Sequence, residues 1–181
     1  MVRPRTGFDA VVLGDGTVLA VGDDFACFPG PAAPGSERAE RYDPATDAWA
    51  EVPSLNKPRK EPATVVRPDG SALVIGGVND VEEAYSSTKR FDPASGAWTD
   101  GPLMELGRGA PLADTLPDGR VFVIGETRAG STSEILDPTS NTWKATASVR
   151  SGAGVDAIVG LGDNSVLANG SVDRGDTESP P

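Results

Sequence analysis

Histidine is absent from the 181 residues, and its absence excludes several kinds of chemistry. Histidine is the commonest general base near neutral pH and a usual ligand of copper and zinc, so neither an imidazole base nor an imidazole metal site is expected. Cysteine occurs once, as Cys27, which excludes an internal disulfide and a cluster of thiolate ligands. We therefore expect no metal and no other cofactor.

Long apolar runs and cationic clusters are also lacking. No stretch of about 20 apolar residues is present, so no membrane-spanning helix is expected. The first residues, Met1 to Pro4, lack the apolar core of a secretory signal, which predicts a cytoplasmic protein, or a secreted one if the chain is a fragment of a longer precursor. The net charge of −11 argues against binding to nucleic acid or to an anionic membrane.

The residues that are abundant favour strands and turns. The chain has 22 Gly and 16 Pro, and no window repeats apolar residues with the spacing of an amphipathic helix. Its apolar runs are short and rich in Val. They are Ala10 to Leu13, Val18 to Val21, Leu73 to Ile75, Val121 to Ile124 and Val166 to Ala168.

The chain is organised around an Asp-Pro pair that is followed, six residues after the Asp, by a Trp. The three copies begin at Asp43, Asp92 and Asp137 and end at Trp49, Trp98 and Trp143. The Asp side chain can accept from the backbone two residues on, and Pro fixes φ for the first turn position. The fourth residue after the Asp is Asp47, Gly96 or Asn141, and all three types tolerate positive φ. We predict a tight hairpin with a left-handed residue at this position.

A second turn precedes each Asp-Pro turn. Pairs of Asp-Gly separate two apolar runs, which is the strongest short-range signal of a hairpin. The pairs are Asp15-Gly16, Asp69-Gly70 and Asp118-Gly119, with Asp163-Asn164 as a weaker fourth copy. The interval from each Trp to the second residue of the next pair is always 21 residues. Four strands per unit, a to d in chain order, therefore keep a fixed frame, and only the b–c loop varies in length.

Four-stranded units that recur every ~45–50 residues are the signature of propeller blades. The run Ala72 to Gly77, the following Arg90 to Trp98 and the preceding Pro58-Arg59 resemble a kelch repeat. The resemblance covers three repeats and half of a fourth. Two features differ from the family: its Gly-Gly pair is intact only at Gly76-Gly77, and its propellers usually have six or seven blades.

We therefore predict an all-β fold, a kelch-type β-propeller segment with three full four-stranded antiparallel blades plus half a fourth. The segment spans 1–172, with repeats at about 5–54, 55–103, 104–149 and 150–170, and a disordered polar tail follows at 173–181. The three Trp are expected to fill gaps between blades. Because the fourth unit stops after strand b, we expect a partner or further blades to close the ring. Two copies do not repair the gap, since both half-blades lack the same strands.

Binding is expected on the face that carries the variable b–c loops, approximately 23–39, 78–88 and 126–132. Arginines occur in register where strand a begins on that face, and an arc of guanidinium groups there suits carboxylates or phosphates. Kelch domains often use such arginines for acidic peptides, so the resemblance implies the same role. The alternative is that each arginine bonds backbone carbonyls of adjacent blades. The candidate ligand-binding residues are Arg5, Arg59, Arg108, Arg150, Asp24, Asn79 and Arg128.

The function predicted is a non-catalytic binding module for a protein or acidic peptide, with a carbohydrate as another ligand class. The alternative is part of a carbohydrate-active propeller enzyme of the oxidase or sugar-acid isomerase type. No phosphate-binding loop, nucleophile elbow or regular calcium loop supports a catalytic assignment. The acidic run 80–83 is interpreted as a solvated loop rather than a calcium site.

Overall fold

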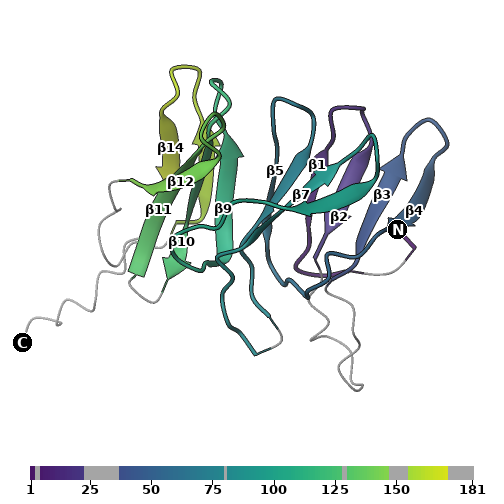
Figure 1. Cartoon of the computed structure of the whole chain (residues 1–181), viewed down its shortest axis with the longest axis horizontal. Helices are drawn as coiled ribbons and strands as arrows, with labels where there is room; N and C mark the ends of the chain where they lie inside the picture. Colours follow the sequence, from purple (N-terminus) through teal and green to yellow (C-terminus); the bar gives the residue numbers. More distant parts are fainter. Residues whose placement is uncertain (3–4, 23–36, 80, 128–129, 147–154, 171–181) are drawn as a thin grey trace, which may run out of the picture.

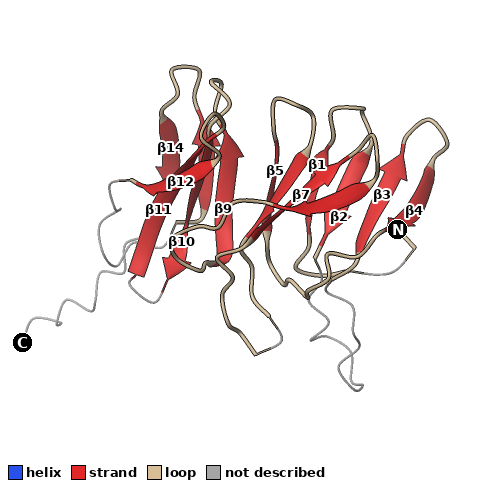
Figure 2. Ribbon diagram, in the orientation of Figure 1, coloured by secondary structure: helices blue, strands red, loops and turns tan. Residues whose placement is uncertain are grey.

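The computed structural model describes the chain except for residues 3–4, 23–36, 80, 128–129, 147–154 and 171–181. Within the described residues every regular element is a β-strand and none is a helix (Figure 2). It follows that this part of the chain has no helix that could cross a membrane.

Fourteen strands form four antiparallel sheets, each in chain order. The first contains β1 (Asp9–Val12), β2 (Val18–Val21), β3 (Ala39–Asp43) and β4 (Ala48–Val52). The second contains β5 (Ala63–Val66), β6 (Ala72–Ile75), β7 (Thr88–Asp92) and β8 (Ala97–Asp100). The third contains β9 (Gly109–Thr115), β10 (Val121–Thr127), β11 (Gly130–Asp137) and β12 (Thr142–Ala145). The last contains β13 (Ala157–Gly160) and β14 (Val166–Asn169).

The sheets stand side by side as three full blades and a half-blade, with β1, β5, β9 and β13 as neighbouring inner strands (Figure 1). Blade 1 and blade 2 also touch at their first turns, where Gly14 N donates to Gly70 O (3.2 Å). The structure confirms the predicted order of strands, with three complete four-stranded units followed by two strands.

The Asp-Pro turns adopt the geometry that their residues predict. In the Asp-Pro turns, Asp47, Gly96 and Asn141 have φ of 51°, 66° and 52°. The Asp at the start of each turn accepts from the backbone N–H two residues later, as in Asp43 Oδ1 from Ala45 N (2.8 Å). The left-handed position and the Asx-turn are therefore both confirmed.

Apolar side chains of consecutive blades form the core. One cluster joins blade 1 to blade 2 and includes Leu19, Val21, Val74 and Phe91, all with no exposed surface. A second cluster joins blade 2 to blade 3. Trp98 packs on the first cluster and Trp143 on the second, and each indole also reaches the preceding blade.

The indole contacts are hydrogen bonds to backbone carbonyls. Trp98 Nε1 donates to Pro53 O (2.6 Å), and Trp143 Nε1 donates to Pro102 O (3.2 Å). The ring of Trp98 lies 4.9 Å from that of Phe91. Trp98 and Trp143 therefore fill the gaps between blades, as predicted.

Figure 1 shows the β6–β7 loop projecting from the end of the sheets opposite to the a–b and c–d turns. One predicted loop is wrong. The stretch 126–132 is not an open loop, because β10 and β11 continue through it and pair Glu126 with Ser131 and Thr127 with Gly130. Strand pairing therefore takes up both ends of the predicted loop, at 126–127 and 130–132.

Candidate functional site

A hollow lies where the inner strands of blades 1 to 3 begin. It has a volume of about 580 Å³. Its walls are the starts of three consecutive strands, at residues 7–11, 61–64 and 110–113. Three separate blades therefore contribute to one concave surface, which is a common location for a ligand site.

Two carboxylates, Asp9 and Glu61, are the charged groups of this wall. Asp9 links two blades, because its Oδ2 accepts from Thr64 N (2.6 Å) while its Oδ1 accepts from Ala10 N (2.8 Å). Burial raises the pKa of Asp9 above 3.8, although these bonds act in the opposite direction. Glu61 is exposed and has a positive φ of 48°. The hollow thus presents acceptors and negative charge.

A smaller hollow of about 230 Å³ lies between blade 3 and the half-blade and includes Glu126 and Asp156 in its lining. At the junction of blades 1 and 2 and at that of blades 2 and 3, a proline stands eight residues before the turn glycine. These prolines are Pro62 and Pro111. A Cβ at Gly22 would come within 2.9 Å of Pro62, and one at Gly76 within 3.1 Å of Pro111. Asp156 replaces that proline, which accounts for the open junction.

The predicted arginines Arg5, Arg59 and Arg108 point into their own blades. Arg59 and Arg108 have no exposed surface, and the side chain of Arg5 is 2% exposed. Arg5 and Arg59 join the end of strand b to the start of strand c, whereas Arg108 joins strand c, at Thr132, to the loop before strand a, at Leu106. The carbonyl acceptors therefore belong to the same blade, and the expectation that they belong to adjacent blades is wrong.

The bonds are equivalent in the first two blades. Arg5 Nη1 donates to Gly22 O (3.0 Å) and Arg38 O (3.0 Å). Arg59 Nη1 donates to Gly76 O (2.7 Å) and Ser87 O (3.0 Å). These contacts hold the two ends of the b–c loop together. Ligand contact by these arginines stays a prediction.

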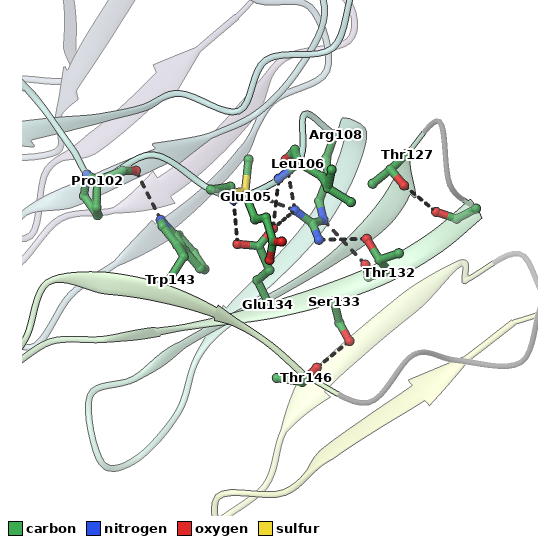
Figure 3. Close-up of polar contacts among 12 residues, drawn as sticks. Pro102, Glu105, Leu106, Arg108, Thr127, Thr132, Ser133, Glu134, Trp143 and Thr146 are labelled. Carbon is green, nitrogen blue, oxygen red and sulfur yellow. Dashed lines mark hydrogen bonds and ion pairs between the residues drawn. The ribbon is translucent and has the colours of Figure 1, made fainter.

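Blades 1 and 3 neutralise the buried arginine with a glutamate on strand c. Arg5 Nη2 pairs with Glu40 Oε1 at 3.1 Å, and Arg108 Nη1 pairs with Glu134 Oε1 at 2.5 Å. Figure 3 shows Glu134 also accepting from the backbone N–H groups of Glu105 (3.0 Å) and Leu106 (3.4 Å). The pair therefore fixes the loop that leads into β9.

Blade 2 differs, because Lys89 stands where the other blades have the glutamate. Lys89 Nζ pairs instead with Asp100 Oδ1 at 2.5 Å. Arg59 forms no ion pair with any described residue, and its buried Nε has no partner there. Burial lowers its pKa to about 10, while its Cζ lies 4.8 Å from the centre of the Tyr85 ring. Among the described residues, blade 2 thus holds a buried guanidinium that packs on Tyr85 in place of a glutamate pair.

The other candidates lie on the loops. Asn79 organises the β6–β7 loop, because its Oδ1 accepts from Val81 N (3.0 Å) and Glu83 N (2.8 Å). Arg150, Asp24 and Arg128 lie outside the described residues, so their assignment as ligand contacts stays a prediction.

Sequence reasoning missed two features of this region. The acceptors at Asp9 and Glu61 carry no repeat signal, since neither occurs at the same position in a second blade. The buried glutamates do carry one, because Glu40 and Glu134 each stand three residues before the Asp of an Asp-Pro turn. That interval, together with the arginine register, is a signal that could have identified the ion pairs.

No family model matches the chain, and no curated protein matches it. Solved structures do. The chain is similar to a fungal alcohol oxidase of the AA5 family in complex with copper, with 23% identity and a TM-score of 0.58 over 77% of this chain. It is also similar to YjhT, with 15% identity and a TM-score of 0.64 over 84% of this chain.

The chain has the fold of a β-propeller segment. The propeller segment spans 30% of the alcohol oxidase chain and 54% of the YjhT chain. Copper does not fit the described residues of the segment, since they contain no group of three or more His, Cys, Asp or Glu side chains that could hold a metal. The likeness therefore concerns the fold.

Proposed function

We propose that this propeller segment is a non-catalytic binding module whose ligand, a protein segment, seats in the hollow at the start of β1, β5 and β9. The observation that supports it is the concave wall of about 580 Å³ to which three blades contribute. Arg5 and Arg59 serve this site indirectly, because they hold the two ends of their b–c loops at the same end of the sheets.

The charge of the wall selects the ligand chemistry. Asp9 and Glu61 favour a basic or hydroxyl-bearing group, because carboxylates attract cations and accept hydrogen bonds. The acidic ligand predicted from the arginine arc would instead need access to guanidinium groups that have no exposed surface in blades 2 and 3. A basic protein segment is therefore the ligand class that we propose.

Glu61→Gln tests this proposal with little effect on the fold, because the side chain is exposed and keeps its size. Lysine- and arginine-rich peptides, acidic peptides and neutral oligosaccharides would be titrated against both proteins. We expect basic peptides to bind the parent chain and to lose affinity by up to about fivefold in the variant, the upper end of the range for one exposed charge pair. Acidic-peptide binding that is unchanged by Glu61→Gln would contradict the assignment and support the arginine arc.

A second candidate is part of a carbohydrate-active propeller enzyme. The likeness to an alcohol oxidase favours it, and a carboxylate-lined hollow also suits a polyol. Any metal-dependent step would have to use residues outside the described part of this segment. Turnover of a sugar or primary alcohol by the chain alone would support this candidate over the binding module.

A further inference from the structure

β14 is a sheet edge in the half-blade. Its only strand partner among the described residues is β13. The equivalent strands of the full blades, β2, β6 and β10, are each paired on both sides. An unpaired edge leaves a row of backbone donors and acceptors open to another strand.

The side chains around this edge are more exposed than their counterparts. Leu167 is 59% exposed, whereas Leu19 and Leu73, which also stand three residues after the turn residue, are fully buried. Val159 and Leu161 on the same half-blade are exposed as well. Leu19 and Leu73 belong to the clusters that join their blades to the next one, so the half-blade leaves exposed an apolar face that a following blade covers elsewhere.

The full blades show which strand covers such an edge. In each of them strand c places a bulky apolar residue opposite the second residue after the turn, in the pairs Val18–Tyr42, Ala72–Phe91 and Val121–Leu136. That apolar residue is followed by Asp-Pro, and it pairs on its other side with the Trp of strand d.

Blades 1 and 2 also share a polar contact between strand c and the first turn. Arg41 bonds Thr17 Oγ1 (2.8 Å) and Asp15, and Arg90 bonds Ser71 Oγ (3.0 Å) and Asp69 (3.4 Å). In both turns the hydroxyl is oriented by its own bond to the Asp.

Blade 3 lacks this contact between strand c and the first turn. Its turn carries Arg120 in place of the hydroxyl residue, and Arg120 Nε pairs with Asp118 at 2.7 Å. Its strand c has Ile135 in place of the arginine, opposite Phe122. Blades 1 and 2 therefore combine a hydroxyl residue in the first turn with an arginine on strand c. Blade 3 combines an arginine in the turn with an apolar residue on strand c.

The half-blade has the hydroxyl type of turn. Ser165 Oγ donates to Asp163 Oδ1 (2.6 Å), as Ser71 Oγ does to Asp69 Oδ1 (2.5 Å). The bonds from Ser165 lower the pKa of Asp163 below 3.8, so the carboxylate is charged near neutral pH. The turn is thus arranged to accept an arginine that no described residue supplies.

We infer that the free edge of β14 binds a β-hairpin from a polypeptide outside residues 1–181, with an arginine opposite Leu167 that bonds Asp163 and Ser165. A bulky apolar residue lies opposite Val166 and is followed by Asp-Pro and, six residues after the Asp, by Trp. The hairpin pairs with β14 and supplies the third and fourth strands that the full blades have. This inference is independent of the ligand proposed for the hollow.

Two observations favour such a hairpin over a second copy of this chain. A second copy would bring another half-blade that lacks the same strands. The similar structures also continue well beyond the matched region, since the segment spans only 54% of the YjhT chain. Charge complementarity at Asp163 then specifies the arginine of the hairpin.

A synthetic peptide with the sequence of residues 86–101 tests the inference, because it carries Arg90-Phe91-Asp92-Pro93 and Trp98. The matched control peptide carries Arg90→Ile, which places at this position the residue type that blade 3 has at Ile135. Binding to the full chain would be measured by fluorescence anisotropy, and protection of the β14 amides by hydrogen exchange. The chain would be used as the parent, as Asp163→Asn, and as Asp15→Asn, which changes the same turn position in blade 1.

We expect the arginine peptide to protect residues 166–169 and to bind about three- to tenfold more tightly than the isoleucine peptide. Asp163→Asn should abolish that difference, and Asp15→Asn should leave it unchanged. Equal binding of the two peptides, or no protection of β14 by either, would overturn the inference. A dimer whose β14 amides are protected without peptide would overturn it in favour of a second copy.

Discussion

Arg108 and Glu134 form an ion pair inside blade 3, with 2.5 Å between Nη1 and Oε1 and almost no exposed surface on either side chain. The same arginine donates to Leu106 O (3.1 Å) and to Thr132 Oγ1 (2.9 Å). Strand a, strand c and the loop before strand a are therefore tied together at one point. Arg5 forms the same kind of pair with Glu40 in blade 1, while Arg59 in blade 2 bonds Ser87 O, at the position of strand c that corresponds to Thr132, without a glutamate.

Glu134→Gln should destabilise the chain by about 3–5 kcal/mol, because it leaves a buried guanidinium without its counter-charge. Urea unfolding of the full chain measures the change. Asp100→Asn is the matched control, since Asp100 is 85% exposed and its pair with Lys89 should contribute little to stability. A loss below about 1 kcal/mol for Glu134→Gln would show that the pair does not hold the blade together.

Gly76→Ala and Gly96→Ala should differ in cost, although both glycines have positive φ. A Cβ at Gly96 meets nothing within 4 Å, so only the backbone preference is lost, at about 1 kcal/mol. A Cβ at Gly76 would lie 2.7 Å from Arg108 O of the next blade, which should raise the cost to about 3 kcal/mol or more. Equal unfolding midpoints for the two variants would contradict the packing of blade 2 on blade 3.

Trp98→Phe should destabilise the chain by about 1–3 kcal/mol, because it removes the indole bond to Pro53 O and leaves space between blades 1 and 2. Thermal unfolding followed by circular dichroism measures the effect. An unchanged midpoint would mean that the indole does not bridge these blades in solution.

Acid should weaken the fold through the turn aspartates. Bonds from Ser95 and Ala94 lower the pKa of Asp92, those from Thr139 and Ser140 lower that of Asp137, and those from Ser165 lower that of Asp163. A folded-state pKa below the ordinary 3.8 means that the unfolded chain binds more protons as the pH falls through this range. The stabilisation is present above about 3.8 and is lost below it.

The urea midpoint should therefore stay nearly constant from pH 7 down to about 5 and then fall below about pH 4. Asp9 acts in the opposite direction, since burial raises its pKa. Its single contribution to the pH dependence of stability is opposed by those of the several turn aspartates. A midpoint that rises as the pH falls below 4 would contradict the assigned turn bonds.

The fold was predictable because it depends on local rules that the sequence repeats. Asp47, Gly96 and Asn141 specify one backbone geometry, and the constant intervals from Trp to turn specify the strands between them. Strand order and the end of the fourth unit follow from these alone.

The site was less predictable, because it depends on contacts between side chains far apart in the sequence. The register placed Arg59 and Arg108 at the start of strand a, yet it did not show that they turn inward to meet Ser87 and Glu134. The pairing of β10 with β11 through Glu126 also has no turn signature. Asp9 joins the site only because Thr64 of the next blade lies beside it.

The repeats are blades that stand side by side and contact one another through their inner strands. Solution NMR tests this arrangement directly, through nuclear Overhauser contacts between Gly14 and Gly70 and between Asp9 and the Thr64 amide. With the blades arranged in this way, we expect both contacts, and others between β5 and β9. Their absence, with contacts between the outer strands β4 and β8 in their place, would contradict this arrangement.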